Sequence, residues 1–526
     1  MNRIHWTDGI LVFFTFFLLG TVWAGIMPLW QGPDEPAHFA YIQYMEYHVL
    51  APRQDIVPAG QAPWIFSPSS SEFASIELSQ RKRILFDPWS WFSMTQSQRQ
   101  GALHELARAS QTVQSQQAGS QNYVAVYPPL YYQSIALFLR LFVMKNILTA
   151  AYAARIITAL WLGIFGVLWN AVLGLVKSSR SLRLTTLMTL ACSIPTLGML
   201  GGTIGNDIVS VTACMGIFLA AVWGFRHISQ LLSKSAAVGF GLVAGLAMWT
   251  KEEAYLALFI TTPFVIHAVW SHAASPRKRW VWLGIAFSVA MGVSLPWLAL
   301  TVHRYQSLVV PLTYQSSGLN PRTFGFVFHR EFWNLPFEMN LMVTQLFFGM
   351  NCPWWKPWDS KPWIHDVLAL TACFLLAGGM IASWKKPGWT LAVTWLAIGG
   401  ATLWTLQWQY DVLTGAYFLQ GRYFLFLVCP FSWLFAHFWL RIHKTVRAAF
   451  LLGSAIISIA TMNHTLWRYY HKSLFSFLDG HIVMLAPISV TDFSRIAVSV
   501  LIGLLIGLLY WTMAIRPNRK TKSPAL

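Results

Sequence analysis

Long apolar runs separated by short polar segments recur along the whole chain. The runs are roughly 16–25 residues long, which is the length of a helix that crosses a lipid bilayer. We place twelve such helices near residues 8–28, 150–176, 184–203, 208–225, 234–250, 254–271, 280–302, 364–383, 388–405, 422–440, 448–464 and 495–514. The sequence therefore predicts an all-α integral membrane protein with about 12 transmembrane helices.

One apolar block, "YPPLYYQSIALFLRLFVM" (Tyr127–Met144), has two interpretations. If it crosses the membrane, the loop before it lies on the cytoplasmic side. If it lies along the membrane surface, that loop stays outside. Arg140 within the block and the two prolines at its start favour a juxtamembrane helix. The stretch Phe337–Met350 is short for a span, and the sequence leaves its placement open.

Composition supports the membrane class, because 56% of the residues are hydrophobic and only 11% are charged. The net charge is +18, yet its placement argues against nucleic acid as a partner. Seventeen Lys and Arg residues fall in six acid-free segments beside apolar blocks, which is the positive-inside pattern. These segments are 177–183, 226–234, 272–279, 384–387, 441–447 and 516–526. We expect all six to face the cytoplasm.

This orientation divides the chain into six parts with both termini cytoplasmic. They are a first transmembrane helix (1–28), an outer first loop with juxtamembrane helices (29–149), a transmembrane bundle (150–302), a second long outer loop (303–363), a further bundle (364–514) and a basic tail (515–526). The start, "MNRIH" before an apolar run, resembles a retained signal anchor. The five cysteines are scattered without a CxxC, so they predict neither a disulfide framework nor a metal site.

Polar chemistry concentrates on the predicted outer face, which holds eighteen of the nineteen acidic residues. Asp34 and Glu35 follow the first span directly, between Pro33 and Pro36. A carboxylate at a membrane boundary can act as a general base or bind a metal. The alternative is a solvated pair at the end of a helix. His38 follows Asp34 by four residues, so a helical turn can bring the two together or leave a plain interfacial histidine.

Two further segments offer candidate residues for substrate binding. In "AVYPPLYYQ", Tyr127 and Tyr131 either form a wall for a lipid substrate or anchor the chain at the interface. In "GGTIGNDIVSV", Asn206 and Asp207 open a span. They either cap its helix or bring a second acid to the cavity of Asp34.

Charged residues at two other membrane boundaries complete the set. Lys251 and Glu252 belong to "WTKEEAYLAL", which interrupts two apolar blocks with almost no loop. A lysine there can neutralise a phosphate, or it can sit in a solvated turn. Arg422 and Tyr423 start a span in "FLQGRYFLFL". An arginine on the outer side suggests an anionic partner, and its alternative is snorkelling to lipid headgroups.

No Walker A motif and no G-x-G-x-x-G followed by a helix occurs in the sequence. We therefore expect the energy source to be a preactivated, membrane-embedded substrate. The absence of an obvious repeat or intramembrane charge relay disfavours a transporter.

The acid pair after the first span, the long outer first loop, the Pro-Pro-Leu-aromatic segment and the many-helix body resemble the GT-C superfamily. These polytopic glycosyltransferases use polyprenyl-phosphate sugars, and protein O-mannosyltransferases are examples. "GPDEPAHFAY" and "QGRYFLF" look like a bacterial family of predicted membrane proteins often assigned to that superfamily.

The resemblance implies an inverting hexosyl- or pentosyltransferase that moves a sugar from a polyprenyl-phosphate donor. The acceptor would be an envelope glycan, lipid or protein on the outer face of a bacterial inner membrane. Asp34 would be the general base, with Glu35 beside it in the catalytic pair. Lys251 and Arg422 would bind the phosphate, a placement that charge and topology suggest. Glu35, His38 and Asp207 would shape the site or hold an ion; the sequence has no clear D-x-D and leaves a divalent metal open.

The sequence is also compatible with two other functions. A transporter or flippase of a lipid-linked saccharide would share the polytopic body, but would need polar groups deep within the spans. A non-catalytic subunit of an envelope-polymer assembly would share the architecture and would not need the acids.

Overall fold

The structure is a computed structural model of the chain. It describes residues 6–29, 32–47, 55–56, 64–65, 95, 97, 124, 127–142, 147–176, 179–305, 362–414, 421–470, 472–480 and 488–514. Most of these residues are helical, and turns join the helices. Two short strands, β1 (Asp55–Ile56) and β2 (Trp64–Ile65), form an antiparallel pair. The prediction of an all-α membrane protein is confirmed.

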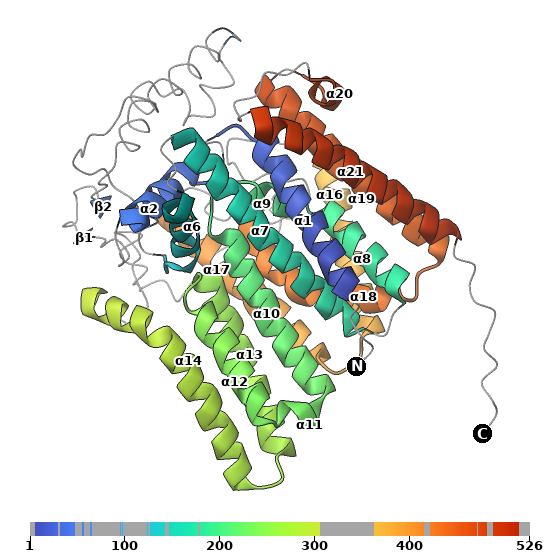
Figure 1. Cartoon of the computed structure of the whole chain (residues 1–526). Helices are drawn as coiled ribbons and strands as arrows, with labels where there is room; N and C mark the ends of the chain where they lie inside the picture. Colours follow the sequence, from blue (N-terminus) through green and yellow to red (C-terminus); the bar gives the residue numbers. More distant parts are fainter. Residues whose placement is uncertain are drawn as a thin grey trace.

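Three long helices form the centre of the bundle, α1 (Trp6–Ile26), α7 (Ile147–Gly174) and α10 (Asp207–Arg226). Figure 1 shows α7 between the other two, and it packs extensively against both. Small residues allow this approach, since a Cβ atom on Gly20 would lie 2.8 Å from the Cβ atom of Ala159. The centre is filled by fully buried aromatic side chains, among them Trp23 and Trp169.

A second group of helices flanks α10 and consists of α11 (Ile228–Leu231), α12 (Lys234–Ala247), α13 (Glu252–His272) and α14 (Pro276–Tyr305). Helix α14 packs on α12 at the margin of the molecule (Figure 1). Only 22% of its most apolar stretch is buried, and side chains such as Phe287 are exposed. A bilayer would cover this apolar surface.

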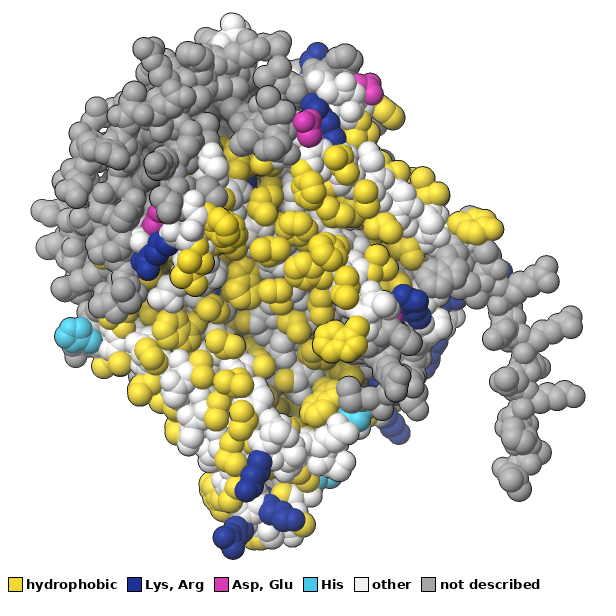
Figure 2. Space-filling model, in the orientation of Figure 1, with side chains coloured by type: hydrophobic (Ala, Val, Ile, Leu, Met, Phe, Trp, Pro, Cys, Tyr) yellow, Lys and Arg dark blue, Asp and Glu magenta, His cyan; other side chains and the backbone are white. Residues whose placement is uncertain are grey.

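The remaining helices complete the bundle on the other sides of α1 and α10. They are α8 (Arg180–Ser193), α9 (Pro195–Gly201), α16 (Pro362–Ala382), α17 (Trp389–Thr414), the 3₁₀ helix η4 (Gly421–Leu427), α18 (Val428–Trp439), α19 (Lys444–Tyr470), α20 (Leu474–Leu478) and α21 (Ile488–Ala514). Helix α21 packs against α1, α19 against α8, and α16 against α18. The space-filling view shows a broad hydrophobic face, with Lys and Arg side chains gathered at its lower tip (Figure 2).

Each of the twelve predicted spans coincides with a helix or with two consecutive helices. Within the described part of the chain, seven helices are long and apolar enough to cross a membrane. The number becomes eight if the bent pair α8–α9 forms one span. The chain is thus a multi-pass membrane protein.

The predicted span 184–203 is broken rather than straight. Helices α8 and α9 meet at an angle of 77° because Pro195 starts α9 and cannot continue the hydrogen bonding of α8. The bend carries the glycine-rich segment after α9 against α1. A Cβ atom on Gly202 would lie 2.5 Å from both the Ala24 nitrogen and the Gly20 oxygen, so only glycine fits.

Two shorter helices, α2 (Glu35–Tyr47) and α6 (Leu130–Phe142), pack together at one end of the bundle. Arg140 of α6 donates hydrogen bonds to the carbonyl oxygens of Met45 and Glu46, near the end of α2. With 13 residues, α6 is about 20 Å long and too short to cross a bilayer. This agrees with the juxtamembrane interpretation of the block that contains it. The stretch 337–350, most of the two predicted loops and the tail 515–526 lie outside the described residues.

Candidate functional site

The turn between α1 and α2 presents Asp34 in an unusual backbone conformation. Its φ is +55°, in the left-handed region that non-glycine residues seldom adopt. Aspartate tolerates this region better than most residues do. Asp34 thus ends the turn with its side chain 33% exposed, while Glu35, the first residue of α2, is buried. Backbone strain of this kind gathers at functional sites.

Asp34 contacts an arginine from the far end of the sequence. The Nη2 atom of Arg422, at the start of η4, donates to Asp34 Oδ2 at 2.7 Å. The Arg422 side chain is only 5% exposed. A charge buried so deeply at a membrane-protein helix end requires partners, and the carboxylate of Asp34 is one of them.

Further ion pairs extend from Arg422 to the start of α13. Its Nη1 atom lies 3.4 Å from Asp207 Oδ2, and Lys251 Nζ lies 2.6 Å from Asp207 Oδ1. Lys251 also pairs with Glu253 at 3.2 Å. We call the series Asp34, Arg422, Asp207, Lys251 and Glu253 the charge chain. It joins the α1–α2 turn, η4, α10 and α13, and it holds three carboxylates and two cations.

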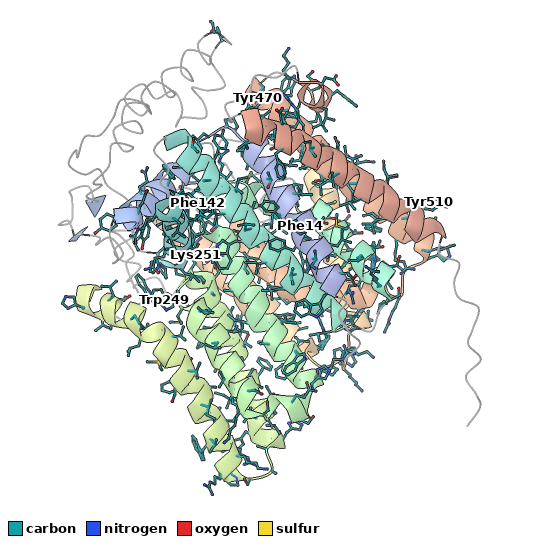
Figure 3. All side chains as sticks on the ribbon, viewed as in Figure 1. Phe14, Phe142, Trp249, Lys251, Tyr470 and Tyr510 are labelled. Atoms are coloured by element: carbon teal, nitrogen blue, oxygen red, sulfur yellow. The ribbon has the colours of Figure 1, made fainter. Side chains whose placement is uncertain are left out.

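Aromatic rings flank the cations of the charge chain. Lys251 Nζ lies 5.3 Å from the ring centre of Tyr127 and 5.1 Å from that of Tyr423, and Arg422 also lies over Tyr423. Figure 3 shows Lys251 beside α6, near Trp249. Burial alone would lower the pKa of Lys251, but the carboxylates of Asp207 and Glu253 raise it well above its usual value. Lys251 is therefore a permanent cation at a place where little water competes.

His38 faces the tyrosines of the first loop. Its Nδ1 atom lies 2.8 Å from the hydroxyl of Tyr132, and its ring stacks on those of Tyr127 and Tyr132. Burial lowers the pKa of His38 to about 4, against a smaller opposing effect of Asp34. The histidine is therefore neutral near pH 7, so it can hydrogen-bond a substrate but cannot supply charge.

Tyr131 supports the backbone instead of lining an open wall. Its hydroxyl accepts a hydrogen bond from the Gly205 nitrogen at 2.8 Å and lies 2.8 Å from Thr158 Oγ1. These contacts fix the segment that precedes α10. Tyr131 therefore has a structural role at the start of α10.

Asn206 and Glu252 lie at the starts of two helices beside the charge chain, Asn206 just before α10 and Glu252 as the first residue of α13. Asn206 precedes α10 without capping it through its side chain. It is buried, and among the described residues neither its amide nitrogen nor its amide oxygen has a hydrogen-bond partner. A buried amide of this kind is available for a ligand's polar group. Glu252 begins α13 next to Lys251, which forms ion pairs with Asp207 and Glu253.

Glu35 differs from the catalytic neighbour that the sequence suggested. Both of its oxygens accept hydrogen bonds from Arg155, at 2.7 Å each. Oε1 also accepts from the Ile204 nitrogen, and Oε2 from the Gly32 nitrogen. Neither Glu35 nor Arg155 is exposed. This geometry suits a residue that fixes the turn rather than one that meets substrate.

Three residues that contact the site residues were not singled out from the sequence: Arg155, Glu253 and Tyr132. Arg155 had a usable signal, because it is a lone charge inside the apolar run of α7. Glu253 and Tyr132 had neighbours of the same type, and only the folded arrangement separates their roles.

Within the described residues, no group of three or more His, Cys, Asp or Glu side chains could hold a metal ion.

The protein is a multi-pass helical membrane protein with a charged, aromatic-lined site at one end of its bundle. The family described as "Predicted membrane protein (DUF2142)" matches residues 17–431, so the chain belongs to that family. This agrees with the resemblance carried by "GPDEPAHFAY" and "QGRYFLF". No curated protein matches the chain.

Solved structures with a similar arrangement include two membrane proteins. The chain is 12% identical to ArnT from Cupriavidus metallidurans bound to undecaprenyl phosphate, with a TM-score of 0.48 over 96% of this chain and 77% of ArnT. It is also 12% identical to the archaeal oligosaccharyltransferase AglB from Archaeoglobus fulgidus in complex with an inhibitory peptide and a dolichol-phosphate. That match has a TM-score of 0.41, and it covers 91% of this chain but only 58% of AglB.

Proposed function

We propose that the protein is a membrane glycosyltransferase of the GT-C type. It would move a sugar from a polyprenyl-phosphate donor to an envelope glycan, lipid or protein. The observation that carries the proposal is the ion pair between a partly exposed carboxylate, Asp34, and a buried cation, Arg422. Asp207 links Arg422 to a second buried cation, Lys251. A proton acceptor beside fixed positive charge is what transfer from a phosphate leaving group requires.

Asp34 would act as the general base. The acceptor's hydroxyl proton passes to the Asp34 carboxylate while the hydroxyl oxygen bonds to the anomeric carbon of the sugar. A neutral hydroxyl is a weak nucleophile, and a positioned base contributes about 10²–10⁴-fold to the rate. The exposed fraction of Asp34, 33%, exceeds that of Asp207 at 7%, which suits Asp34 to meet an acceptor.

Arg422 and Lys251 would stabilise the leaving group. The bond between the anomeric carbon and the phosphate oxygen breaks, and its electron pair remains on the phosphate. Buried cations stabilise this new charge more strongly than exposed ones would, because little water screens them. Attack opposite the phosphate would invert the anomeric configuration.

The donor's prenyl chain would remain in the bilayer. Seven helices are apolar and long enough to cross the membrane, and the charge chain lies where α10 and α13 begin. A lipid phosphate at the interface could reach that level without pulling its tail into water. The basic segments support a cytoplasmic location for the opposite end, so the reaction would take place on the outer face of a bacterial inner membrane.

The test is transfer of radiolabelled sugar from a panel of polyprenyl-phosphate sugars to cell-envelope acceptors. Wild type would be compared with Asp34→Asn, and with Asp492→Asn as a matched control. Asp492 is an exposed partner of Arg495 in α21, so its change has the same chemistry but lies in another part of the bundle.

Transfer by wild type and Asp492→Asn, with a loss of about 10²-fold or more in Asp34→Asn, would support the proposal. Equal transfer by all three proteins would remove Asp34 from the mechanism. Absence of transfer with every donor, combined with flipping of a lipid-linked saccharide in vesicles, would favour a transporter instead.

A further inference from the structure

The cation best placed to bind a donor phosphate is already engaged by carboxylates. Arg422 contacts Asp34 at 2.7 Å and Asp207 at 3.4 Å. The two acids use its terminal nitrogens, Nη2 for Asp34 and Nη1 for Asp207. A phosphate that binds this terminal pair in a bidentate manner must therefore replace a carboxylate.

The charge balance leads to the same conclusion. The charge chain holds the carboxylates of Asp34, Asp207 and Glu253 against the cations Lys251 and Arg422. Acids exceed cations by one, and His38 is neutral near pH 7. Adding an anionic phosphate to this buried set is unfavourable unless one carboxylate moves away.

Asp34 is the most exposed carboxylate of the charge chain. Its side chain is 33% exposed, compared with 7% for Asp207 and 17% for Glu253. Asp207 pairs with both cations, so its release would break two ion pairs. Asp34 also sits at φ +55°, and the chain beside it is held by Glu35, so its side chain can turn while the backbone stays fixed.

We propose that the donor phosphate and the Asp34 carboxylate compete for Arg422, so that donor binding releases Asp34 to act as the base. This rests on the proposed function and adds an order to it. Before the donor arrives, Arg422 holds Asp34 and makes it a weaker proton acceptor. After the donor arrives, Arg422 holds phosphate and Asp34 turns toward the acceptor.

The first test measures binding of undecaprenyl monophosphate, without sugar, to the full-length protein in lipid nanodiscs. Asp34→Asn removes the competitor and should bind this lipid about tenfold more tightly than wild type. Asp492→Asn is the matched control, because it makes the same chemical change at an exposed acid that pairs with Arg495 in α21. Its affinity should change much less.

Tighter binding confined to Asp34→Asn supports competition. Equal affinities of wild type and Asp34→Asn overturn it, and the proposed function still stands if that variant loses transfer. An equal gain in lipid affinity in both variants also overturns it, because the gain would then come from the loss of any negative charge and not from the loss of the Asp34 carboxylate. Failure of wild type to bind the lipid overturns both proposals.

A second test needs no variant. A carboxylate-modifying carbodiimide is applied with and without undecaprenyl monophosphate, and labelled residues are counted by mass spectrometry. Release from Arg422 should raise labelling of Asp34 several-fold and leave Glu35 unchanged, since Arg155 holds Glu35 in either state. Labelling of Asp34 that stays constant or falls while the lipid binds overturns the proposal.

Discussion

Arg155 and Glu35 lie 120 positions apart in the sequence and meet through two hydrogen bonds of 2.7 Å each, with neither side chain exposed. Arg155 also donates to the carbonyl oxygens of Ala24, Met27 and Pro28, where α1 ends. One guanidinium therefore joins α7, the end of α1 and the start of α2. The position of Asp34, one residue before Glu35, depends on this junction.

Replacing Arg155 with methionine should lower the free energy of unfolding by about 3–5 kcal/mol. The change leaves the Glu35 carboxylate buried without its main partner and leaves carbonyl oxygens of α1 unpaired. Denaturant unfolding of the detergent-solubilised protein measures the loss. Arg495→Met is the matched control, because Arg495 is partly exposed and its acid partner Asp492 is more so. A double variant, Arg155→Met with Glu35→Gln, should recover part of the loss. An equal loss in the control would contradict this role for Arg155.

Alanine should be tolerated very differently at two nearby glycines. At Gly202 its Cβ atom would meet backbone atoms of α1 at 2.5 Å, and at Gly205 the nearest contact would be His38 at 3.8 Å. Gly202→Ala should therefore destabilise the protein by about 1–3 kcal/mol, while Gly205→Ala should be close to neutral. Thermal unfolding of the two variants side by side checks the difference. Similar melting temperatures would mean that α9 and α1 are less closely packed than described.

His38 should make stability depend on pH below neutrality. The folded protein keeps the pKa of His38 at about 4 through burial, whereas an unfolded chain takes up the proton near pH 6.5. The unfolded state binds more protons between these values, so stability is full above about pH 6.5 and falls toward pH 4. The loss reaches about 3 kcal/mol.

Unfolding of His38→Gln measured across the same range tests that dependence. Its stability should fall less steeply from pH 6.5 to pH 4 than that of wild type. His443→Gln, a change at an exposed histidine, should keep the wild-type slope. A slope in His38→Gln that matches wild type would assign the acid sensitivity to other groups.

Asp8 offers a test that separates stability from activity. It is fully buried at the start of α1 and pairs with Arg180 at 2.5 Å and Arg183 at 2.6 Å, where α8 begins. Asp8→Asn should lower the melting temperature because Arg183 loses its partner, and sugar transfer per folded molecule should remain at the wild-type level. A fall in transfer per folded molecule would show that this end of the bundle influences the site.

The helices followed from the sequence because the apolar runs have the length that a bilayer requires. The bend at Pro195 did not, since glycine and proline are common in straight membrane helices as well. The packing of α9 on α1 depends on which glycines face a neighbouring helix. Periodicity alone carries no information about that neighbour.

The candidate site was predictable as a set of residues but not as a set of contacts. Counting spans assigned Asp34, Asp207, Lys251 and Arg422 to one side, and the structure brings them into one series of ion pairs. The different partners of Asp34 and Glu35 could not be predicted, because the side chains of adjacent residues at a helix start point in different directions. Their partners, Arg422 and Arg155, come from helices whose positions only tertiary packing determines.

Asp34 and Arg422 are 388 positions apart in the sequence, which has a consequence for how the protein is made. Synthesis starts at the N-terminus, so Asp34, Asp207 and Lys251 enter the membrane before the ribosome reaches Arg422. A chain that stops short of that arginine contains the acid but lacks the cation that holds it. The site is therefore completed late in translation, and fragments released before that point would leave Asp34 without its arginine partner.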